Sequence, residues 1–402
     1  MQIFAPQKII PLGLASLGDS WLSETIFLEG DEYFNALLSA ISNARTRVFL
    51  ESYIFENEHL GMKVLTELQS AHKRGVDVRL LVDGVGSSQW ISSGIFSQPQ
   101  FNFEVRVYHP LPWQIFPGLV SPRGPGVTWL GRLFAYANSR NHRKVCIIDD
   151  AQAFVGSFNV SDVHLRSVFA DKAWHDVGVC VRGSPVEVLV AAFQKSWRRS
   201  WKMQNHHALK PAFEFPKNKQ FEQSTLVIRN DGRALRHKAL SRRLRMMRQA
   251  KKRLWLANAY FVPSGSVLRA LTSAAQRGVD VRLLLPQSSD VSFMPWVARA
   301  FYAQLVAQGV KVYEYEPRIL HAKVMLIDNF ATIGSSNLNH RSLLHDSELD
   351  VIVSTRQSVE HLQKMFERDF AEARKVNPQM SEIRNLWQKW IVKLLLYFRH
   401  ML

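Results

Sequence analysis

The stretch His142-Arg143-Lys144-Val145-Cys146-Ile147-Ile148-Asp149 is followed by the tetrapeptide Gly156-Ser157-Phe158-Asn159. The same pattern returns later in the chain as His321-Ala322-Lys323, then Asp328, then Gly334-Ser335-Ser336-Asn337. A single His-x-Lys is usually a pair of surface residues without a catalytic role, because so short a motif arises easily by chance. Two copies in the same order indicate a duplicated chain whose halves build one site together.

The duplication extends beyond the two motifs. The segment RGVDVRLL occurs at 74–81 and again at 277–284, and RVFLESYIF at 47–55 aligns with RLWLANAYF at 253–261. Helical patterns at 31–44 and 236–250 precede these strands, and amphipathic helices should end at Gly75 and Gly278. Strands that alternate with helices predict an α/β fold. We expect two α/β/α sandwich halves with mixed, largely parallel sheets, packed about a pseudo-two-fold axis with the active site at their interface.

The two halves differ in length. A polar stretch near residue 210 predicts a first domain at 1–210 and a second at 211–379, with an extra segment at 380–402. The repeat offset is 277 − 74 = 203 at the VDVRLL strand but 321 − 142 = 179 at the His-x-Lys motif. The first half therefore carries about two dozen additional residues. They fall at 111–136, a stretch rich in Pro, Gly, Trp and Phe that leads into His142.

Charge and composition restrict the class of partner. Lys and Arg exceed Asp and Glu by 51 − 34 = 17. Such a surface attracts phosphate-bearing partners, either nucleic acid or an anionic membrane. Cys146 and Cys180 sit in alternating apolar runs and are predicted to be buried free thiols, which favours a reducing compartment. No apolar run is long enough to cross a bilayer, so we expect any membrane attachment to be peripheral.

The His-x-Lys spacing predicts a cluster of imidazoles and cations. Residues i and i+2 of an extended strand face the same way, so His142 should project with Lys144, and His321 with Lys323. Docking of the two halves would bring all four side chains to one place. We expect the Gly-Ser turns to add phosphate-binding residues at the rim: Ser157, Asn159, Ser335 and Asn337. This arrangement suits a phosphodiester.

The residue types suggest a mechanism. One imidazole attacks phosphorus to give a phosphohistidine, and the other protonates the leaving alcohol and later deprotonates the incoming one. Lysine and asparagine side chains stabilise the phosphate charge, so we expect neither a metal nor a cofactor. Each histidine needs an acceptor for its second nitrogen. Asp176 and Glu348 start equivalent later strands and are candidates, with exposed strand-end carboxylates as the alternative, and the pairing of carboxylate with histidine stays open.

The remaining motif residues are Asp149 and Asp328. They belong to the repeated catalytic motif and are grouped here with its catalytic residues. Their position beyond the apolar run is also typical of structural anchors.

The twin H-x-K-x-x-x-x-D and G-S-x-N motifs resemble the phospholipase D superfamily over nearly the whole chain. The sequence is most similar to bacterial cardiolipin synthases of the B type, which lack N-terminal membrane spans. This likeness lies in NAYF before a Pro-Ser-Gly turn, RGVDVRLLL, VYEYEPRILHAKVMLID, ATIGSSNLNHRSL and AFVGSFNV. Many relatives have Gly-Gly where this chain has Gly156-Ser157, so substrate preference stays open.

The resemblance implies transfer of a phosphatidyl group from phosphatidylglycerol, through phosphohistidine, to a hydroxyl of a second phospholipid, with release of glycerol. It implies that His142 is the nucleophile and His321 the acid/base.

Two further segments favour a lipid substrate. At 380–402, apolar residues recur at helical spacing with basic residues elsewhere, which predicts an amphipathic helix on an anionic membrane, or alternatively a helix packed on the protein core. The insertion at 111–136 predicts a membrane flap, or alternatively an ordinary surface excursion. We therefore expect a peripheral protein at the cytoplasmic face of a bacterial inner membrane, with phosphatidylglycerol and cardiolipin as partners and no nucleic acid.

Three rival functions remain. A hydrolytic phospholipase D would use water as the acceptor and release phosphatidic acid, but an apolar flap that excludes water favours transfer. A nuclease of the same superfamily would suit the positive charge, but the Trp-rich tail argues against it. A catalytically inactive lipid-binding scaffold is disfavoured because both motifs are intact.

Overall fold

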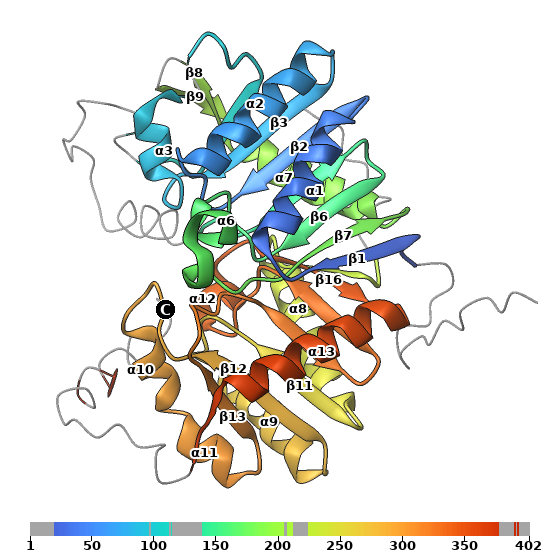
Figure 1. Ribbon diagram of the computed structural model, residues 1–402, viewed down its shortest axis with the longest axis vertical. Helices are drawn as coiled ribbons and strands as arrows, with labels where there is room; N and C mark the ends of the chain where they lie inside the picture. The colour runs from blue at the N-terminus through green and yellow to red at the C-terminus, as the bar shows by residue number, and fades with distance from the viewer. Residues whose placement is uncertain are drawn as a thin grey trace, which may run out of the picture.

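The computed structural model describes residues 20–95, 98–111, 114, 139–204, 207–211, 224–377, 390 and 392–393. The predicted flap at 111–136 therefore lies outside the described residues apart from Leu111 and Gln114. The predicted helix at 380–402 also lies outside them, apart from Trp390, Val392 and Lys393. The two halves stack one above the other, the first in blue to green and the second in yellow to red (Figure 1).

The described strands of the first half form one nine-stranded sheet, in the order β1-β7-β6-β5-β2-β3-β4-β8-β9. The elements follow along the chain as β1 (Ser23–Phe27), α1 (Gly30–Ser42), β2 (Arg47–Ser52), α2 (His59–Lys73), β3 (Asp77–Asp83), α3 (Ser88–Ser93), β4 (Glu104–Tyr108), β5 (Val145–Ile148), β6 (Gln152–Gly156), η2 (Asp162–His164), α6 (Arg166–Phe169), η3 (Ala170–Lys172), β7 (Gly178–Arg182), α7 (Val186–Arg198), β8 (Trp201–Gln204) and β9 (His207–Pro211). The last strand of this sheet along the chain, β9, ends at Pro211.

The second half forms an eight-stranded sheet of described strands, in the order β10-β16-β15-β14-β11-β12-β13-β17. Its elements are β10 (Val227–Arg229), α8 (Arg233–Gln249), β11 (Arg253–Ala257), α9 (Gly265–Gln276), β12 (Asp280–Pro286), α10 (Met294–Arg299), α11 (Tyr302–Ala307), β13 (Lys311–Tyr315), β14 (Val324–Ile327), β15 (Phe330–Gly334), α12 (His340–Leu344), β16 (Leu349–Val353), α13 (Arg356–Glu372) and β17 (Arg374–Lys375).

The first seven strand positions of the two sheets correspond one to one, so the predicted duplicated α/β fold is confirmed. The expectation of largely parallel sheets is wrong. Only β2-β3-β4 and β11-β12-β13 pair in parallel, whereas their neighbours pair antiparallel. For β5-β6 and β14-β15 the cause is local, because these strands are joined by tight turns, and such short connections permit only antiparallel pairing.

The helices predicted at 31–44 and 236–250 agree with α1 and α8 to within a few residues. Gly75 and Gly278 follow α2 and α9 with φ of 87° and 86°, a left-handed conformation that glycine adopts without strain. The helix α9 begins at a cap in which the Ser264 side chain accepts a hydrogen bond from the Val267 N–H. The repeated RGVDVRLL segment that follows each of these helices leads into β3 in the first sheet and β12 in the second, at the same position in the strand order.

The two halves share one continuous apolar core. Buried Phe49 and Phe193 of the first half belong to the same cluster as Leu254 and Phe366 of the second. At the boundary, β1 lies beside β16 and α13 (Figure 1). Trp21 donates from its indole nitrogen to the Ile352 carbonyl at 2.8 Å, which ties the start of the first half to the second sheet. The relative placement of the two halves is therefore held by packing as well as by polar contacts.

The chain also pairs across the boundary at two equivalent places. Asn141 bridges Ser347, and Leu320 bridges His175 in the same parallel sense. These are the residues immediately before His142, Glu348, His321 and Asp176. His142 and His321 consequently lie just before β5 and β14, not within these strands as expected, because their backbone amides bond across the interface to Ser347 and His175.

Candidate active site

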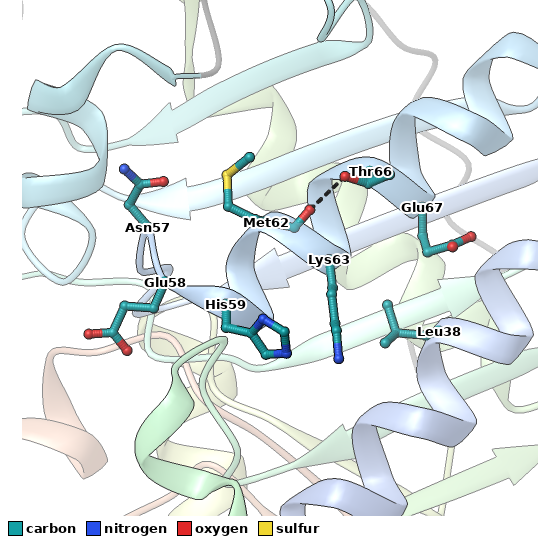
Figure 2. Close-up of a pocket in the computed structure, with 8 residues that line it drawn as sticks. All are labelled: Leu38, Asn57, Glu58, His59, Met62, Lys63, Thr66 and Glu67. Carbon is teal, nitrogen blue, oxygen red and sulfur yellow. Dashed lines mark hydrogen bonds between the residues drawn. The ribbon is translucent and has the colours of Figure 1, made fainter. Parts of the chain in front are cut away.

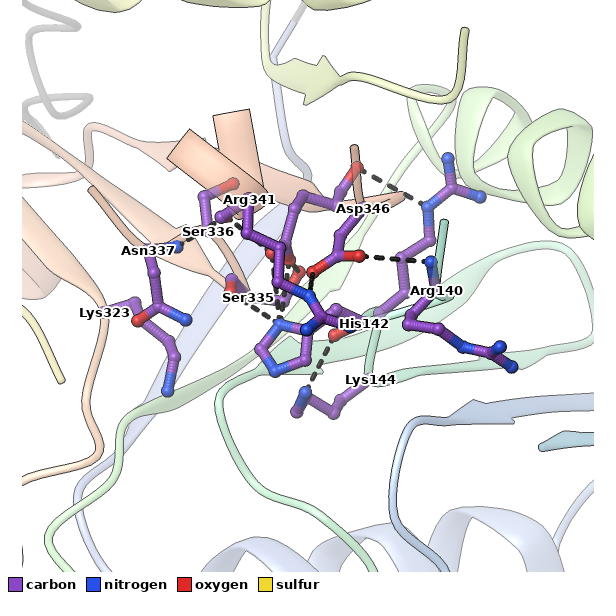
Figure 3. Close-up of polar contacts among 12 residues, drawn as sticks. Arg140, His142, Lys144, Lys323, Ser335, Ser336, Asn337, Arg341 and Asp346 are labelled. Carbon is purple, nitrogen blue, oxygen red and sulfur yellow. Dashed lines mark hydrogen bonds and ion pairs between the residues drawn. The ribbon is translucent and has the colours of Figure 1, made fainter. Parts of the chain in front are cut away.

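The two His-x-Lys motifs meet at the interface between the halves. His142, Lys144, His321 and Lys323 are each buried, with 3–8% of their surface exposed. Figure 3 shows Lys144 and Lys323 on either side of the His142 ring. Burial lowers the pKa of both His142 and Lys144, and the nearby ammonium groups add to this: Lys144 and Lys323 act on His142, and Lys323 acts on Lys144. The duplication therefore brings two imidazoles and two ammonium groups into one site.

The two carboxylates cross between the halves. Glu348 of the second half lies with its Oε1 3.1 Å from Nδ1 of His142, and Asp176 of the first half lies with its Oδ1 2.7 Å from Nδ1 of His321. Both carboxylates are buried. Each half thus supplies the histidine of one pair and the carboxylate of the other, which the sequence had left open.

The hydrogen bonds of His142 identify its tautomer. Its Nδ1 lies 3.2 Å from the Ser335 carbonyl oxygen as well as 3.1 Å from Glu348. A carbonyl oxygen can only accept, so Nδ1 carries the proton and Nε2 keeps its lone pair. A neutral imidazole with an unprotonated Nε2 is the form that a nucleophile requires.

Asp149 and Asp328 are the first correction to the expected catalytic set. The Asp149 carboxylate accepts hydrogen bonds from the backbone N–H groups of Arg45, Thr46 and Arg47 at 2.7–3.2 Å. Asp328 binds the equivalent N–H groups of Lys251, Lys252 and Arg253. Both aspartates lie at the far ends of β5 and β14, where they anchor the turns that start β2 and β11.

Ser157 and Ser335 are the second correction. The Ser157 hydroxyl bonds the backbone of Val177, and the Ser335 hydroxyl donates to Glu348 Oε2 at 2.5 Å. Neither hydroxyl therefore points to a phosphate, because each is already hydrogen-bonded to a residue next to the neighbouring strand, Val177 or Glu348. Asn159 and Asn337 are both buried, and their Oδ1 atoms have no hydrogen-bond partner among the described residues.

The sequence interpretation missed one pair of supporting residues, His164 and Ser342. His164 Nδ1 lies 2.8 Å from Asp176 Oδ2, and the Ser342 hydroxyl donates to Glu348 Oε1 at 2.6 Å. Both lie five residues after the asparagine of the Gly-Ser-x-Asn turn. The register of the duplication could have found them, although the two letters differ.

The two lysines carry unusual electrostatics. Burial and the neighbouring Lys323 lower the pKa of Lys144 to about 7, and burial lowers the pKa of Lys323 to about 8. Each ammonium group donates to the carbonyl of the histidine two residues before it. Each also lies near a tyrosine ring, Lys144 at 5.1 Å from Tyr53 and Lys323 at 5.9 Å from Tyr260. An anion that enters this site would neutralise two closely spaced cations.

Other features of the described residues lie apart from this site. A hollow of about 690 Å³ beside the first turns of α2 is lined by none of the motif residues, and its Thr66 hydroxyl bonds the Met62 carbonyl (Figure 2). The described part of the chain contains no group of three or more His, Cys, Asp or Glu arranged to hold a metal ion. Within the same residues, no helix combines the length and apolar character that a membrane span needs.

Comparison with known proteins agrees with this geometry. A family model described as "Cardiolipin synthase, PLD-like domain" matches residues 37–197 and 244–370. These ranges contain both His-x-Lys motifs and both carboxylates. The chain belongs to this family.

Individual relatives extend the match over most of the chain. Cardiolipin synthase 2 of Bacillus anthracis is 30% identical over 384 residues, which cover 94% of this chain and 70% of that protein. A cardiolipin synthase of Listeria monocytogenes is 28% identical and covers 91% of this chain and 72% of its own length. The fold also matches the crystal structure of phosphatidylserine synthase from Haemophilus influenzae, with a TM-score of 0.68 at 13% identity, covering 94% and 95% of the two chains.

Proposed function

We propose that this protein is a phosphatidyltransferase that makes cardiolipin from phosphatidylglycerol and a second phospholipid, with release of glycerol. The observation that carries this proposal is the crossed pair His142–Glu348 and His321–Asp176 with a buried lysine beside each histidine. It occurs in a chain whose curated relatives are named cardiolipin synthases.

In the first step, the lone pair on His142 Nε2 attacks the phosphorus of the donor lipid. A bond from nitrogen to phosphorus forms as the bond from phosphorus to the glycerol oxygen breaks. Burial and then Lys323 lower the pKa of His321 to about 4, against the opposing effect of Asp176 and Asp290, and a bound phosphate anion raises this pKa again. In its imidazolium form, His321 gives the proton from its Nε2 to the departing glycerol oxygen. Lys144 and Lys323, with the side-chain amides of Asn159 and Asn337, hold the charge on the non-bridging oxygens.

In the second step, the hydroxyl of an acceptor lipid takes the place of glycerol. His321, now neutral, removes the hydroxyl proton as its oxygen attacks phosphorus, and the bond to His142 breaks. The phosphatidyl group is thereby transferred, and both imidazoles return to their starting protonation states. If water took this position instead, the product would be phosphatidic acid.

The proposed substrate implies a membrane surface. We infer that the protein is peripheral, acts on anionic phospholipid at the cytoplasmic face of a bacterial inner membrane, and has no nucleic-acid partner. The net charge of +17 favours an anionic surface. Trp390 is 71% exposed with the Lys393 ammonium near its ring, a combination suited to a lipid interface.

The test is an assay of products from vesicles of phosphatidylglycerol. The wild-type protein should produce cardiolipin and free glycerol in equal amounts, and His142→Ala should produce neither. Phosphatidic acid as the only lipid product would replace the proposal with hydrolysis. Cleavage of single-stranded DNA without any action on the vesicles would replace it with a nuclease.

A further inference from the structure

The carboxylate of Asp176 faces two imidazoles. Its Oδ1 lies 2.7 Å from His321 Nδ1, and its Oδ2 lies 2.8 Å from His164 Nδ1. Both Asp176 and His164 are fully buried. The contact to His164 falls short of an aligned hydrogen bond, but neither atom has another partner among the described residues. Buried polar atoms are normally paired, and among the described residues these two atoms have only each other, at 2.8 Å.

The other nitrogen of His164 determines its tautomer. The backbone N–H of Asn159 donates to His164 Nε2 at 3.2 Å, so Nε2 is an acceptor and carries no proton. The proton of the neutral ring is therefore on Nδ1, the atom that faces Asp176. His164 therefore links two parts of the site. Its Nε2 accepts the backbone N–H of Asn159, and its Nδ1–H faces the carboxylate of Asp176.

Ser342 occupies the same position in the second half. It accepts the Asn337 N–H at 2.9 Å and donates to Glu348 at 2.6 Å. In both halves one side chain thus connects the backbone N–H of the motif asparagine to the carboxylate. In the first half this side chain is the imidazole of His164, and in the second it is the hydroxyl of Ser342. This is a specific break in the symmetry of the site, and it lies directly behind the two reacting histidines.

The two carboxylates differ in charge. Burial acts to raise the pKa of Asp176, but the contacts with His321 and His164 outweigh it and hold the pKa well below its usual range. Burial instead raises the pKa of Glu348 to about 7 despite its two serine hydroxyls. Asp176 is therefore an anion at neutral pH, whereas Glu348 is partly protonated. The other ionisable groups within electrostatic reach of Asp176 are Lys144, Lys323 and Tyr260, and His321 also faces the Asp290 carboxylate, which raises the His321 pKa.

An anionic carboxylate behind an imidazole stabilises the imidazolium, and a neutral one does not. We propose that His164 is a positioning residue that holds Asp176 as an aimed anion and thereby gives His321 the proton-transfer role. His142, backed by the weaker charge of Glu348, is left as the nucleophile. This inference rests on the proposed phosphohistidine route and adds a structural reason for the division of roles between two otherwise equivalent histidines.

The experiment separates proton transfer from general damage by changing the leaving group. The variants are His164→Leu, which removes the donor, and His164→Ser, which copies the arrangement at Ser342. Each is assayed on phosphatidylglycerol and on phosphatidyl-p-nitrophenol, whose phenolate leaves without a proton. The first step on the second lipid is read as the burst of nitrophenolate, and thermal denaturation reports whether each variant is folded.

We expect His164→Leu to slow transfer from phosphatidylglycerol by about tenfold or more, within the range of general acid catalysis. The nitrophenolate burst should change by less than about twofold, since that step needs no acid. The alkaline limb of kcat/KM for phosphatidylglycerol should move to lower pH, because a less stable Asp176 anion lowers the His321 pKa. His164→Ser should recover part of both effects.

The matched control is Ser342→Ala, which touches the carboxylate behind the nucleophile and should slow both lipids alike. Equal losses on both lipids for a folded His164→Leu variant, with an unmoved alkaline limb, would overturn the proposal and leave His164 a structural residue. The cardiolipin product of the wild-type protein tests the proposed function separately, so failure of one inference is distinguishable from failure of the other.

Discussion

Glu348 of the second half lies 3.1 Å from His142 of the first, so the imidazole with a free Nε2 is aimed by a carboxylate from the other repeat. Asp176 serves His321 in the opposite direction. In neither half does the histidine of the His-x-Lys motif meet its carboxylate from the same half. The catalytic unit is therefore the docked pair of halves, and any change that alters their docking alters both imidazoles together.

Replacement of Glu348 by glutamine tests this dependence. Glu348→Gln keeps the shape of the side chain but offers no charge to the Nδ1 proton, so we expect transfer to fall roughly 10²–10³-fold. Folding should not suffer. Burial raises the Glu348 pKa to about 7, so the ionised form destabilises the fold as pH rises from about 4.5 to 7. Thermal denaturation at pH 8 should show equal or higher stability, and the exposed Glu360→Gln should change neither property.

For the anchoring aspartates Asp149 and Asp328 we expect the opposite of the Glu348 result, a loss of stability with little loss of activity. The Asp328 carboxylate accepts three backbone N–H groups, and its own φ is 46°, a left-handed conformation in which alanine is strained. Asp328→Ala should lower the free energy of unfolding by about 1–3 kcal/mol, measured by urea denaturation. Activity per folded molecule should stay within about twofold of the wild type. Asp328→Asn keeps an acceptor and tolerates the backbone, so it should lose less stability; a large loss of turnover at full folding would return Asp328 to the catalytic set.

The sequence predicted the fold through its duplication and predicted the site through two motifs in register. It did not predict the crossing of Asp176 and Glu348, because the choice between carboxylates depends on how two halves dock and not on strand periodicity. It misassigned the hydroxyls of Ser157 and Ser335 because the sequence of a Gly-Ser turn does not show which way the serine side chain points. His164 and Ser342 occupy equivalent positions in the two repeats but differ in residue type, so a search for identical residues in the repeats did not find them.

The lysines predict a proton uptake on anion binding. Burial lowers the pKa of Lys144 to about 7 and that of Lys323 to about 8, so at pH 8 much of this pair is neutral. A bound phosphate favours the charged ammonium and raises both pKa values. Titration calorimetry with inorganic phosphate at pH 8, in buffers of different ionisation enthalpy, should show uptake on the order of one proton per site. Lys323→Met should reduce that uptake, and an enthalpy independent of the buffer would contradict the assigned shifts.

Covalent trapping distinguishes the two histidines. If His142 is the nucleophile, a radiolabelled phosphatidyl donor should label the wild-type protein, and His142→Ala should remain unlabelled. His321→Ala lacks the acid and base but keeps the nucleophile, so a donor with a nitrophenolate leaving group should label it and the label should persist, because no base activates the acceptor. The attachment should be stable in alkali and lost in acid, as expected of a phosphoramidate. Labelling of His142→Ala together with loss of labelling in His321→Ala would reverse the roles, and with them the part assigned to His164.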